Sequence, residues 1–290
     1  MFFLLLAIMC STCLLLIFKY IQRQKLSKLQ VIIVNYFTAA AIGALTTPGK
    51  ISFSYFLSQA WFPLTILLGI IFISVFYSVA LSTQLNGVAI TSVAFKLSLV
   101  IPVAAAYFLY GDKFGFMKIA GILLALAAIL LTSMGESDNS KKAGGWAALL
   151  PLVVFIGSGI TDAFFNFMQK RYLSQQDFSS FLGILFFTAG TAGTVAFLFS
   201  WLKKQSVFQP KAAGAGVLLG IPNYGSAYFL ILALEHSGME PSALWPLNNI
   251  GIILLSTASA AVIFRERIGR HGAAGIITAI TAIALIAFSF

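Results

Sequence analysis

The stretch from Gly87 to Gly111, GVAITSVAFKLSLVIPVAAAYFLYG, has the length and apolar character of a membrane-crossing helix. Lys96 lies inside it, and a charge at that depth costs about 2.5–3.5 kcal/mol on insertion scales. We therefore predict that a partner or a substrate compensates for this cost and that the helix lines a translocation pathway. The alternative is that Lys96 extends its ammonium group to the nearer membrane interface. Pro102 lacks a backbone donor and is expected to weaken the helix.

The composition of the whole chain points the same way. Of its 290 residues, 60% are hydrophobic and 9% are charged, and the mean hydropathy is +0.97. A soluble domain carries about 25% charged residues, so a membrane protein is predicted. The net charge of +10 is assigned to loops that face anionic headgroups, and no nucleic-acid partner is expected. The first residues, MFFLLLAIMC, lack a basic region and predict a retained first span in a bacterial inner (plasma) membrane.

Ten mainly apolar segments follow one another along the chain, each near the length that a membrane span requires. The links between them are too short to fold as separate domains. The predicted fold is therefore an all-α polytopic membrane protein, built as one multi-pass helical bundle. The predicted spans are 2–18, 30–47, 61–84, 88–110, 115–133, 146–169, 179–202, 213–235, 241–264 and 270–289.

The two halves of the chain match when one is shifted along the other by 150 to 154 residues. We predict two five-helix repeats, 1–135 and 146–290. Because five is odd, the second repeat enters the membrane from the opposite side, which makes an inverted repeat with a solute site at the junction of the halves. The matched pairs include Phe37 and Phe187, Gly69 and Gly220, Tyr77 and Tyr228, Asp112 and Glu266, Ala125 and Ala279, and Ala128 and Ala282.

An acidic residue closes the fourth and the ninth predicted helix, in the segments YFLYGDKF (107–114) and VIFRERI (262–268). With ten spans in two repeats, the chain resembles the drug/metabolite transporter superfamily, in its EamA branch. That family usually has Gly-Glu at this place, whereas this chain has Asp112 for Glu in the first copy and Arg265 for Gly in the second. The resemblance implies a carrier for small metabolites or drugs in the inner membrane, with both termini inside the cell.

The distribution of basic residues gives the opposite orientation. The loops after the first, fifth, seventh and ninth predicted spans hold 12 of the 18 Lys and Arg residues. The positive-inside rule places those loops in the cytoplasm and both termini outside. The membrane orientation therefore stays open at the level of the sequence.

Asp162 is the second charge, after Lys96, that falls clearly within a predicted span. Asn166 and Lys170 follow at intervals of four and share its helix face. A carboxylate in hydrocarbon is costly unless a cation is near or a proton is bound. Asp162 is expected either to pair with Lys96 or to take up and release a proton during transport. The alternative is a structural contact with Thr161 or a neighbouring helix.

Two later helices carry amides and aromatic residues in apolar surroundings. In the eighth, Asn223 and Tyr228 follow Pro222, and in the ninth, Trp245, Asn248 and Asn249 surround Pro246. Amides in a span must find partners, so they bind a solute or hold helices together, and both roles stay open. Trp61, Trp146 and Trp201 are predicted in an interfacial belt, and Glu235, His236 and Glu240 are predicted to be solvated.

The sequence has no nucleotide-binding loop and no catalytic set of Ser, His and Asp, so we expect a carrier and not an enzyme. The expected function is secondary transport of a small organic solute, such as an amino acid, by alternating access. Lys96 would attract an anionic group and Asp162 an amine or a proton. One alternative is a multidrug or organic-cation exporter, and another is a membrane-embedded enzyme for lipid-linked substrates. The expected partners are the solute, the lipid bilayer and a coupled proton, with no cofactor and no metal.

Overall fold

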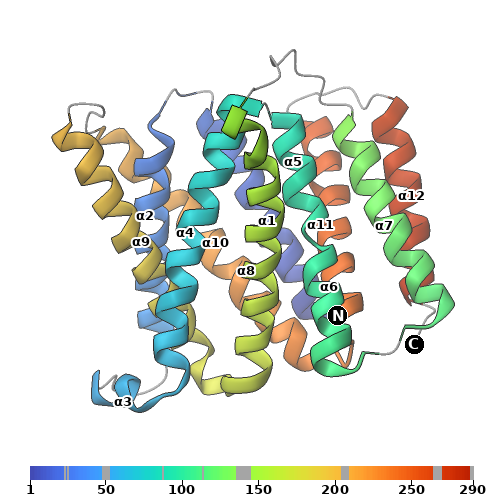
Figure 1. Ribbon diagram of the computed structural model, residues 1–290, viewed down its shortest axis with the longest axis horizontal. Coiled ribbons are helices and arrows are strands. Elements are labelled where there is room, and N and C mark those ends of the chain that lie inside the picture. The colour runs from blue at the N-terminus through green and yellow to red at the C-terminus, as the bar shows by residue number, and fades with distance from the viewer. Residues whose placement is uncertain are drawn as a thin grey trace. The chain divides into compact units, whose positions relative to one another are not determined.

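The computed structural model describes residues 1–22, 24, 26–47, 53–86, 88–112, 114–134, 145–203, 209–263 and 270–287, and these residues form helices and short connections (Figure 1). The helices are α1 (Phe2–Gln22), α2 (Lys28–Thr46), α3 (Phe53–Ser58), α4 (Trp61–Asn86), α5 (Val88–Leu97), α6 (Val100–Tyr110), α7 (Phe116–Met134), η1 (Gly145–Leu149), α8 (Leu150–Tyr172), η2 (Gln175–Asp177), α9 (Phe178–Leu202), α10 (Lys211–His236), α11 (Pro241–Ile263) and α12 (Arg270–Ala287).

Every predicted span overlaps at least one of these helices, which confirms the all-helical class for the described residues. Six described stretches are long and apolar enough to cross a membrane, and three shorter apolar stretches lie in α1, α7 and α12. A complete count of ten spans stays a prediction. The six stretches are Lys28–Thr46, Trp61–Thr83, Val93–Tyr110, Trp146–Tyr172, Gln175–Leu202 and Lys211–His236.

The predicted helix at 88–110 is divided, because α5 ends at Leu97 and α6 begins at Val100. Pro102 explains the position of the break. It has no N–H to donate to Ser98, four residues earlier, and its ring clashes with that carbonyl group. The amide of Ile101 instead bonds to the Ser98 oxygen at 2.9 Å, one residue short of the α-helical pattern. The predicted weakening by Pro102 is therefore confirmed.

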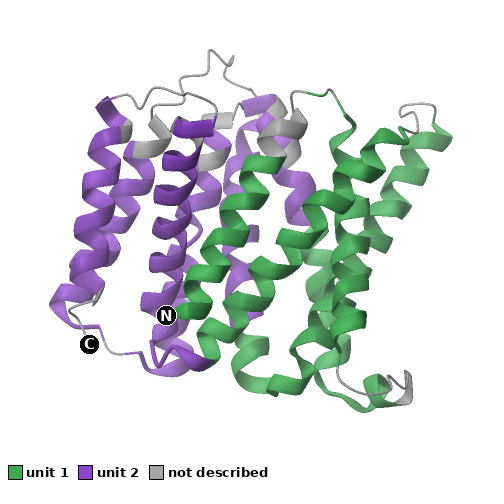
Figure 2. Ribbon diagram, turned by 180° about the vertical axis from the view of Figure 1, so that it is seen from behind, with its two compact units in different colours: residues 1–73, 167–235 green, residues 74–166, 236–290 purple. Residues whose placement is uncertain are grey.

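The described residues form two compact units, coloured separately in Figure 2. Unit 1 consists of residues 1–73 and 167–235, and unit 2 consists of residues 74–166 and 236–290. Each unit therefore takes residues from both predicted repeats. The division of the chain into repeats at 1–135 and 146–290 stays a prediction.

In unit 1, α2 packs tightly against α9. A Cβ atom on Gly43 would lie 2.7 Å from the Gly183 Cα, so only glycine allows the two backbones to approach this closely. Further along, Ile33 lies against Gly193, and the rings of Phe37 and Phe187 have centroids 5.9 Å apart. The two helices therefore run antiparallel along this contact.

Helix α10 packs on another side of α2 through Gly216 and Gly220. A Cβ atom on Gly216 would lie 2.7 Å from the Val31 carbonyl oxygen, and one on Gly220 would lie 2.7 Å from that of Asn35. Two glycines four residues apart form the small-residue stripe that brings membrane helices together. Gly220 therefore allows α2 and α10 to approach closely. Helix α10 also runs without interruption through Pro222.

In unit 2, α7 packs against α12, and α11 packs against α6. The contact between α7 and α12 is centred on the buried residues Ala125, Ala128, Ala279 and Ala282, together with Ile250 of α11. Small side chains allow close packing here too, since a Cβ atom on Gly121 would lie 2.6 Å from Ile286. The four alanines are the same residues that match when the two halves of the sequence are aligned.

The interfacial position predicted for Trp146 and Trp201 stays a prediction, and the one predicted for Trp61 is wrong. Trp146 and Trp201 are exposed, whereas Trp61 is 1% exposed. The Trp61 ring packs edge-on against Phe56 of α3, with centroids 6.0 Å apart. The short helix α3 covers Trp61, and no signal in the sequence of the connecting segment revealed this cover.

Candidate functional site

Helix α8 carries a stripe of polar residues in unit 2, namely Ser158, Asp162 and Asn166. They lie four residues apart and therefore share one helix face. Ser158 and Asn166 are buried, with exposed fractions of 3% and 1%. Among the described residues, the Ser158 Oγ and the Asn166 Oδ1 have no hydrogen-bond partner. Buried polar atoms almost always find a partner, so this stripe is a candidate for solute binding.

Asp162 lies between these two residues and is partly buried. Its neighbour Thr161 donates its hydroxyl proton to the Gly157 carbonyl oxygen at 2.7 Å, so Thr161 is occupied by its own helix. A Cβ atom on Gly159 would lie 2.4 Å from the Ile101 side chain, which shows that α8 packs closely against α6. The α8 stripe is thereby held beside the helix pair that contains Lys96.

Helix α11 supplies the second group of buried polar atoms in unit 2. Trp245 and Asn248 have exposed fractions of 5% and 6%. The Trp245 Nε1 and the Asn248 Oδ1 have no partner among the described residues. Asn249 differs, because its side-chain amide donates to the Trp245 carbonyl oxygen at 3.0 Å. The Asn249 amide is therefore satisfied within its own helix. Trp245 and Asn248, in contrast, have polar groups that can bind a ligand.

Lys96 lies in the last turn of α5, two residues before the break at Ser98 and Leu99, and is partly buried. The end of a helix leaves carbonyl groups without intrahelical partners, and a cation near them is stabilised by the helix dipole. The break therefore lowers the cost of a lysine inside the span. Direct pairing of Lys96 with Asp162 stays a prediction.

The predicted residues Asn223 and Tyr228 belong to unit 1 and lie on α10. The Tyr228 ring stacks on Tyr224, with centroids 5.6 Å apart and an interplanar angle of 14°. The Asn223 carbonyl oxygen accepts a hydrogen bond from Ser226 Oγ at 2.8 Å. Both predicted residues are partly buried, so each keeps part of its side-chain surface accessible within this unit.

Tyr224 organises a hydroxyl network in unit 1 that the sequence did not predict. Its hydroxyl group lies 2.7 Å from Thr46 Oγ1 and donates to Ser179 Oγ at 3.2 Å. These three residues come from α10, α2 and α9. The network therefore ties one end of the three packed helices together, and the stacked ring of Tyr228 rests on it.

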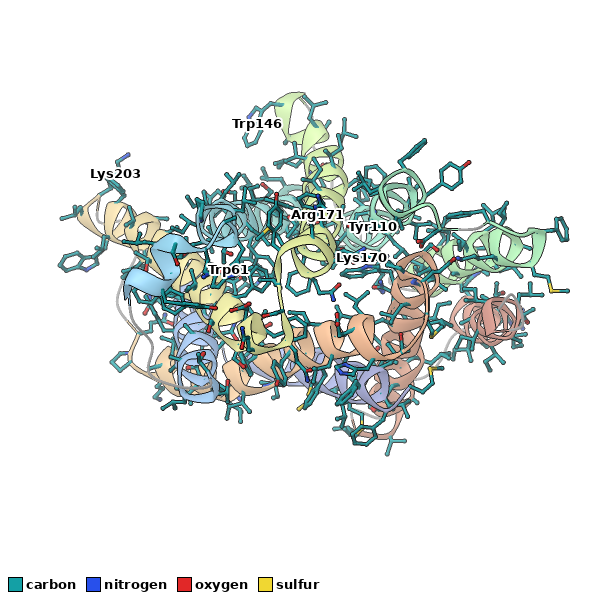
Figure 3. The ribbon with its side chains drawn as sticks, turned by 90° about the horizontal axis from the view of Figure 1, so that it is seen from below. Trp61, Tyr110, Trp146, Lys170, Arg171 and Lys203 are labelled. Carbon is teal, nitrogen blue, oxygen red and sulfur yellow. The ribbon has the colours of Figure 1, made fainter. Side chains whose placement is uncertain are left out.

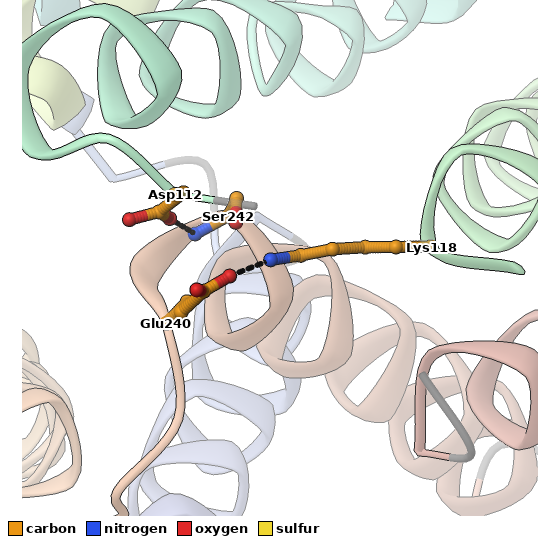
Figure 4. A network of polar contacts seen from close by, with 4 residues as sticks. All are labelled: Asp112, Lys118, Glu240 and Ser242. Atoms are coloured by element: carbon orange, nitrogen blue, oxygen red, sulfur yellow. Dashed lines mark hydrogen bonds and ion pairs between the residues drawn. The ribbon is translucent and has the colours of Figure 1, made fainter. Parts of the chain in front are cut away.

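A second polar network lies at one end of unit 2 (Figure 4). Lys118 of α7 is 2% exposed and forms an ion pair with Glu240, next to the start of α11. Asp112, at the end of α6, accepts a hydrogen bond from the Ser242 backbone N–H at 3.0 Å. Three helix ends are joined by these two contacts. In the sequence, the signal for the burial of Lys118 is its place in the first turn of the predicted span 115–133.

Glu235 and His236 are exposed, as predicted, whereas Glu240 is partly buried. Glu240 pairs with Lys118, and Glu235 accepts a hydrogen bond from Gln169 Nε2 at 2.8 Å within unit 1. Gln169 precedes Lys170 and Arg171 at the end of α8, and Figure 3 labels these two basic residues. Charged groups at the helix ends thus fix the ends of helices to one another. Their partners come from distant parts of the sequence, which is why spacing alone did not find them.

Outside the apolar stretches, Tyr55 of α3 donates its hydroxyl proton to Asp177 Oδ1 at 2.7 Å. This hydrogen bond, with a smaller contribution from burial, raises the pKa of the Tyr55 phenol above its usual value. Asp177 also accepts from the hydroxyl group and backbone N–H of Ser174, which closes the turn before α9. The contact holds α3 over the adjacent helix end.

The polar groups of unit 2 can bind a polar solute and exchange protons with it. The described residues contain no group of three His, Cys, Asp or Glu side chains that could hold a metal ion. What they contain is the partly buried carboxyl group of Asp162 on α8, on the same helix face as buried hydroxyl and amide oxygens, and an amide with an indole N–H on α11. These groups can donate to and accept from a polar solute.

Comparison with known proteins supports the fold. No family model matches the chain. The chain is similar to a protein of Haemophilus influenzae, described as an uncharacterized protein, with 28% identity over 294 residues that cover 96% of this chain and 94% of the relative. It is also similar to a protein of known crystal structure, with a TM-score of 0.77 and 16% identity over 99% of this chain and 96% of the other. The resemblance to the EamA family stays a prediction.

Proposed function

We propose that this protein is a secondary transporter that moves a small organic solute, such as an amino acid or related metabolite, across the plasma membrane. One observation carries the proposal: membrane-length helices of unit 2 bury several polar atoms that have no partner among the described residues. Such atoms cost about 1–3 kcal/mol each when nothing binds them. A protein that binds and releases a polar solute needs groups of this kind.

The chemistry assigns a role to each group. Asp162 binds the amine of the solute or carries a coupling proton, and Asn166 and Asn248 orient polar groups beside it. Lys96, held at the break between α5 and α6, attracts the carboxylate. Trp245 supplies an indole donor and a flat apolar wall. Asn223 and Tyr228, on α10 of unit 1, stay predicted contacts of the solute.

An inverted repeat supports alternating access, and the packing within each unit agrees with one. At an offset of 150 residues, Gly43 is equivalent to Gly193, and Ile33 is equivalent to Gly183. A repeat that makes the contact of Gly43 with Gly183 should therefore also make the contact of Gly193 with Ile33. Both contacts are present in unit 1. Phe37 and its equivalent, Phe187, touch each other directly, as residues beside a two-fold axis do. In unit 2, the alanine core of α7 and α12 consists of pairs that match at an offset of 154 residues.

The experiment is a transport assay with purified protein in liposomes. Radiolabelled amino acids and organic cations are offered with and without a pH gradient. The proposal expects saturable uptake of an amino acid or related metabolite, reduced at least tenfold by Lys96→Ala. Uptake of organic cations that Lys96→Ala leaves unchanged would favour the multidrug exporter instead. The absence of any uptake, together with turnover of a lipid-linked substrate, would favour the membrane-embedded enzyme.

A further inference from the structure

An apolar groove of about 470 Å³ lies on unit 1 between α2, α9 and α10. Its walls include Ile33 and Val34 of α2, Phe197 and Leu198 of α9, and Ala213 of α10. The first turns of α10 carry alanine and glycine, from Ala212 to Gly216, so no large side chain of α10 fills the space beside α9. The hollow is therefore a consequence of the small residues that bring α10 close to α2.

One end of the groove is polar and the other is apolar. At the polar end, Gln30 Oε1 accepts from the Gln209 backbone N–H at 2.7 Å, and Gln209 Oε1 accepts from the Ser27 N–H at 2.7 Å. From Gln30 to Phe37 the groove follows α2 for about 10 Å, a third of the thickness of a hydrocarbon layer. A ligand that fits it is amphipathic, with an apolar chain in the groove and a polar head at this end.

The polar end is strongly basic. Lys28 begins α2, Lys203 follows α9 and Lys211 begins α10, and each is exposed and lies within two residues of a residue that lines the groove. Figure 3 shows Lys203 extending away from the helices. In the sequence, the segments around these lysines, 19–29 and 203–211, contain no acidic residue. Their basic residues are Lys19, Arg23, Lys25, Lys28, Lys203, Lys204 and Lys211.

We propose that this groove binds an anionic phospholipid, with one acyl chain between α9 and α10 and its phosphate against Lys28, Lys203 and Lys211. Basic residues beside the bilayer attract anionic headgroups. Trp201, which lines the same end and is 51% exposed, suits the level of the headgroups. A second copy of the chain is a poor occupant, because two-fold pairing through this face brings two basic clusters together. The proposal is independent of the transported solute.

The test is native mass spectrometry of the intact protein released from nanodiscs of phosphatidylglycerol or of phosphatidylcholine with identical acyl chains. The result expected is one retained phosphatidylglycerol and no retained phosphatidylcholine. Lys203→Gln with Lys211→Gln should weaken retention by about tenfold or more, since each basic residue near the headgroups contributes severalfold. Lys170→Gln with Arg171→Gln, which removes two exposed charges from the other end of unit 1, is the matched control and should retain the lipid.

A second variant tests the groove rather than the charge. Ala213→Trp fills the groove at an exposed position, so the protein should fold, keep its lysines and lose the lipid. Equal retention of both lipids, or undiminished retention by Ala213→Trp, would overturn the proposal. A dimer that persists without lipid and is dissociated by Ala213→Trp would overturn it too, since the occupant would then be a second copy.

Discussion

The buried ammonium group of Lys118, at the start of α7, forms an ion pair with the carboxylate of Glu240, which directly precedes α11 (Figure 4). The Lys118 side chain is 3% exposed and that of Glu240 is 35% exposed. Helices α7 and α11 also contact each other. The pair therefore fixes the start of one helix to the start of another. Substituting its residues measures how much a contact between helix ends contributes to stability.

We expect Glu240→Gln to lower the free energy of unfolding by about 2 kcal/mol, because it leaves the Lys118 charge buried without its carboxylate. This value lies below the range for fully buried pairs because Glu240 is partly exposed. Lys118→Met with Glu240→Gln should recover most of the loss, since the uncompensated charge is then gone. Thermal unfolding in detergent measures both variants. A double variant less stable than Glu240→Gln alone would contradict this account.

Gly43→Ala should destabilise unit 1 by about 1–3 kcal/mol, because its Cβ atom would lie 2.7 Å from the Gly183 Cα and 2.9 Å from the Ser179 carbonyl oxygen. The matched control is Gly214→Ala in α10, where an added Cβ atom meets nothing within 4 Å. This control should stabilise the protein by about 0.4–1 kcal/mol, because alanine favours a helix. Equal melting temperatures for the two variants would show that α2 and α9 are not in close contact.

The contact of Tyr55 with Asp177 predicts a dependence of stability on alkaline pH. The hydrogen bond raises the pKa of the phenol in the folded protein, so folded Tyr55 keeps its proton above about pH 10, where unfolded chains lose theirs. The stabilisation is therefore complete below that pH and is lost as the pH rises through the folded value. Ultraviolet titration measures the ionisation of the tyrosines in wild type and in Tyr55→Phe. The variant should lack one tyrosine that ionises late, at high pH. If the ionisation missing from Tyr55→Phe lay at the ordinary pKa of tyrosine, the result would argue against the contact.

Much of the helical architecture follows from the sequence alone. Runs of about 20 apolar residues are a strong signal, and every predicted span contains a helix. The break before Pro102 follows from the chemistry of one residue. The matched alanines at 125, 128, 279 and 282 were visible as repeated letters, although the sequence did not show that they meet in one core.

The contacts at helix ends could not be predicted in the same way. Lys118 and Glu240 are separated by 122 residues, and Tyr55 and Asp177 also by 122. Periodicity reports which face of a helix is apolar, but it does not report which distant helix covers that face. The burial of Trp61 could not be predicted for the same reason, because the helix that packs over it, α3, lies in a connection between predicted spans.

The candidate site was accessible to sequence reasoning because charges and amides are rare in apolar helices. Asn166, Trp245 and Asn248 were selected for that reason, and each has a buried polar atom with no partner among the described residues. Asn249 was selected by the same rule, yet its amide bonds to its own helix. The rule finds polar groups in a span, but only coordinates separate those that the fold has already satisfied.

The central claim is that Asp162 acts in the movement of a solute, and the most direct test is uptake driven by a pH gradient in liposomes. The comparison uses wild type, Asp162→Asn and the matched control Asp177→Asn, which lies in the connection before α9, at equal amounts of folded protein. The account predicts that Asp162→Asn reduces uptake at least tenfold and removes its pH dependence, while Asp177→Asn retains both. Unchanged uptake with unchanged pH dependence in Asp162→Asn would contradict it.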